Sequence, residues 1–95
     1  MSWEVRYHSE VADDLEAIGP SQAARAMRVI DARLHLGEPD KSGKPLGGDL
    51  AGCRRIRAGD MRVIYRLNPG RKEVVVLAVG PRRHEEAYRK AGRRT

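Results

Sequence analysis

The 95-residue chain contains no Phe, one Trp and three Tyr, so its core has to be built mainly from aliphatic side chains. It offers few aromatic rings on which nucleotide bases would stack, and any binding of nucleic acid therefore has to rely on charge. The single cysteine, Cys53, cannot form an internal disulfide. The first ten residues carry charges instead of the apolar run of a signal peptide, and no run is long enough to cross a membrane. We expect one domain over residues 1–95, located in the cytoplasm.

Positive charge is concentrated in the second half of the chain. Residues 1–52 contain six Lys or Arg and nine Asp or Glu, a balance of −3, whereas residues 53–95 contain thirteen and four, a balance of +9. Eleven of those thirteen cations are Arg, whose planar guanidinium suits bidentate binding of phosphate or carboxylate. A GC-rich genome would explain the choice of Arg over Lys, but not the segregation. The charge distribution favours an anionic partner for the second half.

The first half has the pattern of one strand followed by two helices. Residues 3–7 alternate between apolar and polar side chains, which is typical of a strand with one buried face. Ser9 is a suitable N-terminal cap for a first helix, and Gly19-Pro20 would end that helix. Apolar residues recur at helical spacing over residues 23–34, which predicts a second helix with Gly37 as its left-handed C-terminal cap.

The second half has the pattern of three strands and a short helix. Turn-forming residues dominate residues 38–52, and an irregular loop of that length is typical of a segment that borders a functional site. Residues 53–57 and 61–67 are expected strands, and the wholly apolar strand over residues 74–79 is expected at the centre of the sheet. A helix over residues 83–91 and a basic tail follow. The expected fold is α+β in the order β-α-α-β-β-β-α, with a small, mainly antiparallel sheet.

Arginines are clustered in the two strands that follow the loop. Residues two apart in a strand share a face, so Arg55 and Arg57 point the same way, and Arg62 on the next strand joins them if the register allows. Like charges side by side on a sheet repel each other. We therefore expect an anion such as phosphate to bind there. An ordinary solvated sheet face is the alternative, and it would be sufficient for Arg54 and Arg66.

The chain resembles the RelE/ParE superfamily of bacterial type II toxin-antitoxin toxins, and it is closest to the RelE branch. The resemblance is carried by GKPLGGDLAGCRRIRAGDMRVIYRL and VVVLAVGPRRHEEAYRKA, and the expected opening strand and helix pair agree with it. It implies a RelE-like (microbial-RNase-like) fold and cleavage of messenger RNA in the ribosomal A site. The ParE branch inhibits DNA gyrase and usually lacks the nuclease residues, so a gyrase inhibitor is the alternative function. A module that binds RNA without cutting it is a third possibility.

The resemblance also implies an active site. RelE uses two basic residues on one strand, an arginine on the next, an arginine after the last strand and a tyrosine in the C-terminal helix. These roles fall on Arg55, Arg57, Arg62, Arg82 and Tyr88. They would assist attack of a 2′-hydroxyl on the adjacent phosphorus without a metal, leaving a 2′,3′-cyclic phosphate. Further contacts to RNA are expected from Lys44, Arg54 and Arg83.

The general base of such a reaction stays open. RelE has lysines at the positions of Arg55 and Arg57, and arginine is not a base because its pKa stays above about 12. His84 is a candidate because it would lie one helical turn before Tyr88 and imidazole titrates near neutral pH. An exposed helix position without a catalytic role is the alternative for His84, and Glu85 and Glu86 either serve as the base or pair with arginines.

No metal or other cofactor is expected. The three histidines and the single cysteine lack the spacing of metal ligands, and Cys53 at a strand start is expected to be a packing residue. The resemblance implies macromolecular partners instead. These are the ribosome with its messenger RNA and a RelB-like antitoxin, whose extended, helical, acidic segment would wrap around the toxin in a heterotetramer that represses its own operon. No membrane partner is expected.

Overall fold

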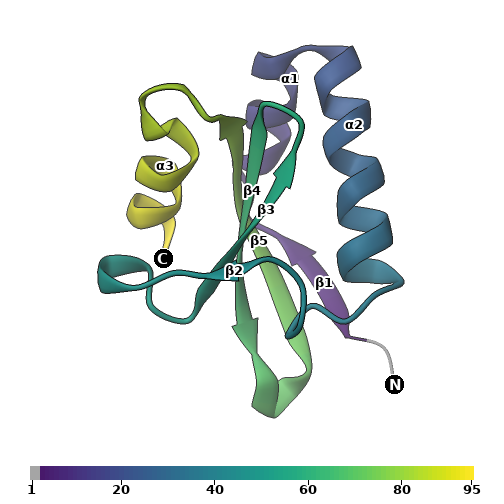
Figure 1. Ribbon diagram of the computed structural model, residues 1–95, viewed down its shortest axis with the longest axis vertical. Helices are drawn as coiled ribbons and strands as arrows, with labels where there is room; N and C mark the ends of the chain where they lie inside the picture. Colours follow the sequence, from purple (N-terminus) through teal and green to yellow (C-terminus); the bar gives the residue numbers. More distant parts are fainter. Residues whose placement is uncertain (1–2) are drawn as a thin grey trace.

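The computed structural model describes residues 3–95 and contains a five-stranded sheet with helices on both faces (Figure 1). The strand order is β1-β5-β4-β3-β2; β1 pairs in parallel with β5, and all other neighbouring strands are antiparallel. The expected α+β fold with a mainly antiparallel sheet is confirmed. In chain order the strands and helices are β1 (Glu4–Tyr7), α1 (Val11–Ile18), α2 (Pro20–Ile30), β2 (Lys44–Pro45), β3 (Cys53–Ala58), β4 (Met61–Asn68), β5 (Glu73–Pro81) and α3 (Glu86–Arg94).

Helices α1 and α2 cover one face of the sheet (Figure 1). Ile30 and Leu34, one helical turn apart, are fully buried in one cluster with Val63 and Tyr65 of β4 and Val76 of β5. Burying an aliphatic side chain of this size stabilises the fold by about 1.5–3 kcal/mol. The aliphatic stripe read from the sequence is therefore the contact that attaches the helices to the sheet.

Helix α3 packs on the opposite face through small side chains. Its Ala87 and Ala91 contact a cluster that includes Ile64, Leu77 and Ala78. The register of β4 and β5 shifts by one residue at this point. Ile64 lies opposite Ala78, but the next residue of β4, Tyr65, lies opposite Val76. This bulge leaves Leu77 as the extra residue. Leu77 and Ala78 both lie beneath α3 as a result.

The ends of the first two helices differ from the sequence prediction. Ser9 does not cap α1, which begins at Val11 after Glu10 and has no side-chain cap hydrogen bond. Beyond α2 the chain continues in a wider π-helical turn over Asp31–His35, and Gly37 is not left-handed. The backbone N–H of Leu36 donates to the oxygen of Asp31 at 2.9 Å, so the helix terminates without a glycine cap.

The segment over residues 38–52 is more ordered than expected. It contains β2, which pairs with β3, and a 3-10 turn over Gly48–Leu50. Because β2 adds a fifth strand at the far edge, the central strand is β4 and not β5, and the placement predicted for residues 74–79 is off by one strand. Within residues 3–95, no helix has the length and apolarity needed to cross a bilayer.

Candidate functional site

The register of the β3–β4 hairpin brings three arginines onto one face of the sheet. Arg57 lies opposite Arg62, and Arg55 lies opposite Ile64. Ile64 belongs to the cluster beneath α3, and residues opposite each other on neighbouring strands share a face, so all three arginines lie on the α3 face. The expectation that Arg62 joins the other two is confirmed. Lys44 of β2 lies opposite Arg55 and extends the basic row.

The turn of this hairpin holds the Arg62 side chain. Gly59 has a φ of 64°, which suits the first central residue of a two-residue hairpin turn. Arg62 is only 7% exposed, and its Nη1 donates to the backbone oxygens of Met61 at 3.1 Å and Gly59 at 3.4 Å. The guanidinium is therefore fixed in place before any ligand binds, which is favourable for stabilising a developing negative charge.

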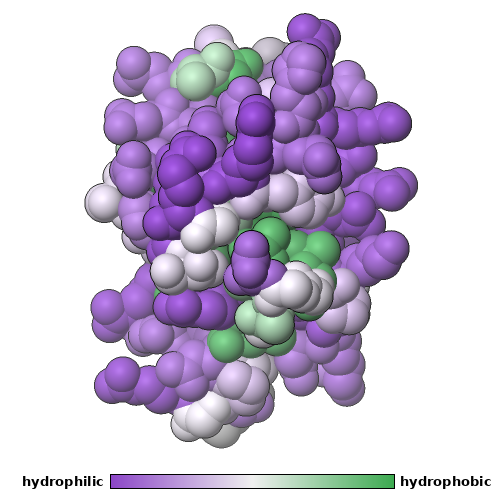
Figure 2. Space-filling view, turned by 90° about the vertical axis from the view of Figure 1, so that its left-hand side faces the viewer, coloured by the Kyte–Doolittle hydropathy of each residue, from purple (hydrophilic) through white to green (hydrophobic). Residues whose placement is uncertain are grey.

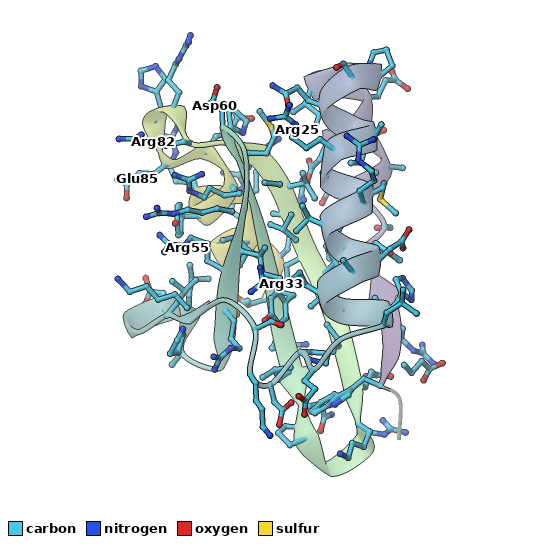
Figure 3. The ribbon with its side chains drawn as sticks, turned by 45° about the vertical axis from the view of Figure 1, so that its right-hand side comes forward. Arg25, Arg33, Arg55, Asp60, Arg82 and Glu85 are labelled. Atoms are coloured by element: carbon cyan, nitrogen blue, oxygen red, sulfur yellow. The ribbon has the colours of Figure 1, made fainter. Side chains whose placement is uncertain are left out.

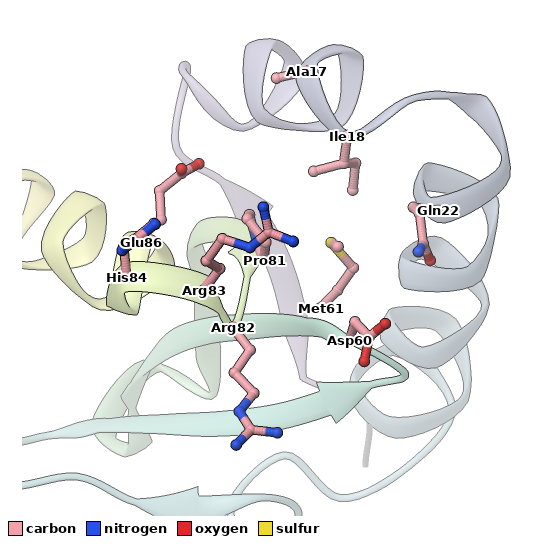
Figure 4. A pocket seen from close by; sticks show the side chains of 10 residues that line it. All are labelled: Ala17, Ile18, Gln22, Asp60, Met61, Pro81, Arg82, Arg83, His84 and Glu86. Atoms are coloured by element: carbon pink, nitrogen blue, oxygen red, sulfur yellow. The ribbon is translucent and has the colours of Figure 1, made fainter.

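Arg82 reaches the same region from the end of β5. Its backbone N–H donates to the backbone oxygen of Asp60 at 2.9 Å, which ties it to the hairpin turn. In Figure 4 the Arg82 side chain extends over the hairpin strands, whereas that of Arg83 extends the opposite way. Figure 3 shows Arg82, Glu85 and Arg55 on the side of the hairpin that faces away from α2. The four arginines named from the sequence thus meet on one side of the molecule.

Tyr88 joins the arginine cluster from α3. Arg55 donates from Nη1 to the Tyr88 hydroxyl at 3.2 Å, a contact between the sheet and the C-terminal helix that the sequence did not predict. The Nε of Arg55 is buried and has no hydrogen-bond partner among the described residues. An unpaired buried donor is costly, and an anion at this position would satisfy it.

The arginine cluster is left without acidic partners. None of the ion pairs formed within residues 3–95 involves Arg55, Arg57, Arg62 or Arg82. Seen from the α3 side, the surface is mostly hydrophilic, and apolar surface is confined to small areas (Figure 2). Unpaired cations gathered on a hydrophilic face favour an anionic ligand.

The position of Tyr88 depends on a buried carboxylate that sequence reasoning did not identify. Asp14 of α1 is 2% exposed. Arg94 of α3 binds it through both terminal nitrogens, at 2.7 and 3.0 Å, and Lys90 approaches it at 3.2 Å. The backbone N–H of Val79 donates to it at 3.0 Å. The sequence predicted that Arg94 belongs to a basic tail after the last helix. This prediction is wrong, because α3 extends to Arg94 and Arg94 binds Asp14 of α1.

The ionisation of Asp14 is set by two opposing effects. Burial alone would raise its pKa, but hydrogen bonds from Arg94, the Val79 N–H and Lys90 outweigh burial, and the pKa is lowered. The pKa values of Lys90 and Arg94 are raised, in both cases with hydrogen bonds to Asp14 contributing. Asp14 thus stays ionised as the anchor of α3. Asp14 lies three residues after Val11 and therefore on the same helix face, and this spacing in the sequence could have indicated that Asp14 faces the core.

The Arg54 side chain lies on the opposite face of the sheet from Arg55 and Arg57. Because strand residues alternate, it lies on the face covered by α2, where its Nε donates to the backbone oxygen of Ser42 at 2.6 Å and its Nη2 to that of Gly43 at 3.3 Å. Tyr65 donates to the same Ser42 oxygen at 2.7 Å. Arg54 therefore holds the preceding loop against β3, and the structure does not bring it to the other predicted RNA-binding residues.

Arg83 and His84 border a separate open cleft beside the arginine cluster (Figure 4). His84 and Glu85 both have left-handed backbone conformations, with φ of 58° and 51°, and lie before α3 begins. The prediction that His84 sits one helical turn before Tyr88 is therefore wrong. The cleft has a volume of about 1120 Å³ and is lined by Ala17, Ile18, Gln22, Asp60, Met61, Pro81, Arg82, Arg83, His84 and Glu86.

Cys53 is buried at the start of β3 and packs in the cluster beneath α3. Burial raises the pKa of its thiol, although nearby Arg66 opposes the effect. A thiol with a raised pKa is a weak nucleophile at neutral pH. These features agree with the packing role expected from the sequence.

Comparison with known proteins places the chain among bacterial toxins. The profile of the family described as "ParE toxin of type II toxin-antitoxin system, parDE" matches residues 5–86. The chain is 32% identical to toxin RelE of Mycobacterium tuberculosis over 93 residues, covering 94% of this chain and 93% of that toxin. The toxin-antitoxin complex RelBE2 from the same organism contains a similar chain, with 32% identity, a TM-score of 0.76 and coverage of 86% and 93%. A mutant of Escherichia coli toxin RelE in the free state shares the fold, with 20% identity, a TM-score of 0.78 and coverage of 99% and 98%.

Proposed function

The chain belongs to the ParE toxin family, within the RelE/ParE superfamily of type II toxin-antitoxin toxins, and we propose that it is a ribosome-dependent endoribonuclease that cleaves messenger RNA and stops translation. The observation that carries this proposal is the convergence of Arg55, Arg57, Arg62 and Arg82 on one side of the β3–β4 hairpin. The phosphodiesters of RNA supply the anions that this cluster lacks.

The proposed reaction is a transfer within the RNA. The 2′-oxygen of one nucleotide loses its proton and forms a bond to the adjacent phosphorus, while the bond from phosphorus to the 5′-oxygen of the next nucleotide breaks. That 5′-oxygen takes up a proton. The products are a 2′,3′-cyclic phosphate and a 5′-hydroxyl, and no metal takes part in this scheme.

Arginine side chains supply charge stabilisation in this scheme. Arg62, held by the hairpin turn, and the exposed Arg82 bind the oxygens of the phosphate that is cut. Arg55 and Arg57 neutralise that phosphate and its neighbour, and Tyr88 contacts the nucleotide. One preorganised donor contributes roughly 10²- to 10³-fold to a reaction rate. General acid–base catalysis contributes a similar roughly 10²- to 10⁴-fold, so several arginines account for much of the rate.

The proton of the 2′-hydroxyl has to pass to a group other than arginine. Glu86 is already paired with Lys90 at 3.1 Å. His84 and Glu85 form no ion pair within residues 3–95 and lie on the turn that follows Arg82. We propose His84 as the base because it lies two residues after Arg82 and lines the same cleft as Arg82. A pH–rate profile that changes in His84→Ala and not in Glu85→Gln supports this assignment; the reverse result transfers the role to Glu85.

Cleavage of an end-labelled messenger on translating ribosomes tests the site. Arg62→Ala and Arg82→Ala should each slow cleavage by roughly 10²- to 10³-fold, because each removes a donor to the reacting phosphate. Arg71→Ala, an exposed cation in the turn between β4 and β5, is the matched control and should cut like the parent. Parental rates in both site variants would contradict the assignment.

A second candidate function is inhibition of DNA gyrase without any nuclease activity. The observation in its favour is that the matching family profile is that of ParE toxins. It leaves the unpaired arginine cluster and the Arg55–Tyr88 contact without a role, whereas cleavage of RNA uses both.

We also propose that the protein acts in the cytoplasm and is neutralised there by a RelB-like antitoxin. The similar chain from Mycobacterium tuberculosis was solved as a toxin-antitoxin complex. The +9 charge of residues 53–95 attracts an acidic segment, which would compete with RNA for the same face. A heterotetramer that represses its own operon is the expected assembly. Co-purification with the product of an adjoining reading frame tests this proposal.

A further inference from the structure

A second basic hollow lies beside the arginine cluster, on the open edge of β3, and we call it the β3-edge groove. It has a volume of about 360 Å³. Every ionisable residue that lines it is a cation, and no carboxylate does. The lining residues are Arg33, Lys41, Gly43, Lys44, Arg55, Ile56 and Arg57.

The groove exists because β2 is short and begins only at Lys44. Its two residues pair only with Arg54 and Arg55, so beyond Arg55 the outer edge of β3 has no partner strand within residues 3–95. The Arg55 carbonyl faces this edge, since a side chain at Gly43 would collide with it. Backbone groups of alternate strand residues face the same edge, so the N–H and C=O of Arg57 face the groove. An unpaired N–H is a donor for a phosphate oxygen.

Arg33 reaches the groove from the π-helical turn after α2, far from β3 in sequence. In Figure 3 it lies between the end of that helical segment and the hairpin. Its Nε donates to the Ser42 hydroxyl at 3.4 Å, and that hydroxyl donates to the Arg33 backbone oxygen, also at 3.4 Å. Lys41 lies beside Ser42 on the loop, and its one ion-pair partner within residues 3–95 is the exposed Glu38, at 3.4 Å. Such an exposed pair is weak and leaves Lys41 available for a stronger anion.

The groove and the proposed cleavage site are continuous. They share Arg55 and Arg57, and the buried Nε of Arg55 has no acceptor among the described residues. Ile56 is the only apolar side chain in the lining, so the groove offers almost no apolar pocket for a peptide side chain. The charge and the continuity with the cluster favour the backbone of a nucleic acid strand over a peptide.

We propose that the β3-edge groove binds a phosphodiester of the RNA strand next to the one that is cut, with Arg33 and Lys41 as its outer contacts. The proposal rests on the proposed function. Arg33 and Lys41 would bind and position the strand without touching the reacting atoms. Their loss should therefore weaken binding of RNA and leave the chemical step unchanged.

The test measures binding of a 2′-O-methyl RNA oligonucleotide, which has no 2′-hydroxyl and cannot be cut. The double variant Arg33→Ala/Lys41→Ala is compared with Arg28→Ala/Arg71→Ala, which removes the same charge at exposed positions outside the groove. Each lost phosphate contact on a single strand reduces the slope of log affinity against log salt by about 0.7. The groove holds one phosphate in this proposal, so we expect a reduction of about 0.7 in the groove variant and the parental slope in the control.

Cleavage on ribosomes then separates the two proposals. The groove variant should raise KM and keep the parental kcat, unlike Arg62→Ala. If the parent cuts no RNA but the groove variant still loses affinity, the nuclease proposal fails and the groove stands. Equal slopes in the groove variant, the control and the parent would overturn the groove. Binding of poly-glutamate that depends on Arg33 and Lys41, while RNA binding does not, would reassign the groove to an acidic peptide.

Discussion

At the residue scale, the arginines of the candidate site differ from lysines in their permanent charge and in their number of hydrogen-bond donors. A guanidinium keeps its charge at any physiological pH, so in the proposed reaction Arg55 and Arg57 stabilise charge and exchange no proton. Five N–H donors per side chain also need more acceptors, and the contact of Arg55 with Tyr88 satisfies only one nitrogen. The buried Nε, which has no hydrogen-bond partner within residues 3–95, is a donor that a lysine side chain would not carry.

The hydroxyl of Tyr88 should matter separately from its ring. Tyr88→Phe keeps the ring but leaves the Nη1 of Arg55 without its acceptor at 3.2 Å, so Arg55 is held less firmly. We expect kcat on ribosomes to fall about tenfold, the equivalent of one hydrogen bond. Tyr7→Phe, which removes a hydroxyl on the first strand, is the control and should keep the parental rate. An unchanged rate in Tyr88→Phe would mean that only the ring contributes.

At the scale of elements, α3 is attached to the rest of the fold by charge as well as by packing. Its apolar contacts are made by small residues, chiefly Ala87 and Ala91, which bury little area. The contact of Arg94 and Lys90 with Asp14 supplements them and crosses the whole chain, from α1 to the last helix. Because α3 also carries Tyr88, this attachment orders one side of the candidate site.

Asp14→Asn should therefore destabilise the protein. The amide still accepts a hydrogen bond from Val79, but Arg94 loses its buried carboxylate partner and keeps only the exposed Glu10, 3.7 Å from its Nε. Breaking a buried ion pair costs about 3–5 kcal/mol. Glu16→Gln, an exposed acid on the same helix, should cost less than about 0.5 kcal/mol. Urea unfolding at neutral pH measures the difference. Equal midpoints for the two variants would show that the Asp14 contacts do not stabilise the fold.

The same contacts predict how stability depends on pH. The folded-state pKa of Asp14 is lowered, so its contribution is complete above the unfolded-state pKa and is lost as the pH falls through that value toward the folded-state one. The parent should lose stability below about pH 5, as an ordinary carboxyl begins to protonate in the unfolded chain. Asp14→Asn should show a shallower loss over the same window.

At the scale of the whole molecule, the cations of the second half and the acids of the first half lie on different elements of the fold. The arginine cluster and the β3-edge groove follow the hairpin. The acids of the first half lie instead on β1, on α1 and the residue before it, on the π-helical turn after α2 and on the loop over residues 38–52, and α2 itself has none. Across the sheet, α1 and α2 cover one face, and the smaller α3 covers only part of the other (Figure 1). The partly uncovered face is the one that carries the arginines, so access for a large anion and positive charge coincide there.

The two candidate functions differ most clearly in their target. If the arginine cluster cuts RNA, the purified protein should cleave messenger on ribosomes and leave supercoiling by gyrase unchanged at the same concentration. The reason is that none of the four guanidiniums has an acidic partner within residues 3–95, which suits the cluster to phosphate. A gel assay of plasmid supercoiling run beside the ribosome assay measures both. Loss of supercoiling with intact messenger would support the gyrase inhibitor instead.

The secondary structure and the shared face of Arg55 and Arg57 were readable from the sequence. The two-residue alternation of a strand and the apolar stripe of a helix are local properties, and neighbouring residues are enough to establish them. The roles of Arg62 and Arg82 came from resemblance to a family. Helix ends were predicted less well, because the hydrogen bonds that end α2 form within a π-helical turn with no sequence signal of its own.

Only the tertiary structure decided which distant residues meet. The bond between Arg82 and Asp60, the burial of Asp14 beneath Arg94 and the approach of Arg33 to β3 all join segments that are separated in the chain. Such contacts depend on strand register, on the short length of β2 and on how the helices pack, and each of these is a property of the assembled sheet. The sequence therefore determined the elements and the chemistry they carry, while packing determined that this chemistry gathers along one hairpin.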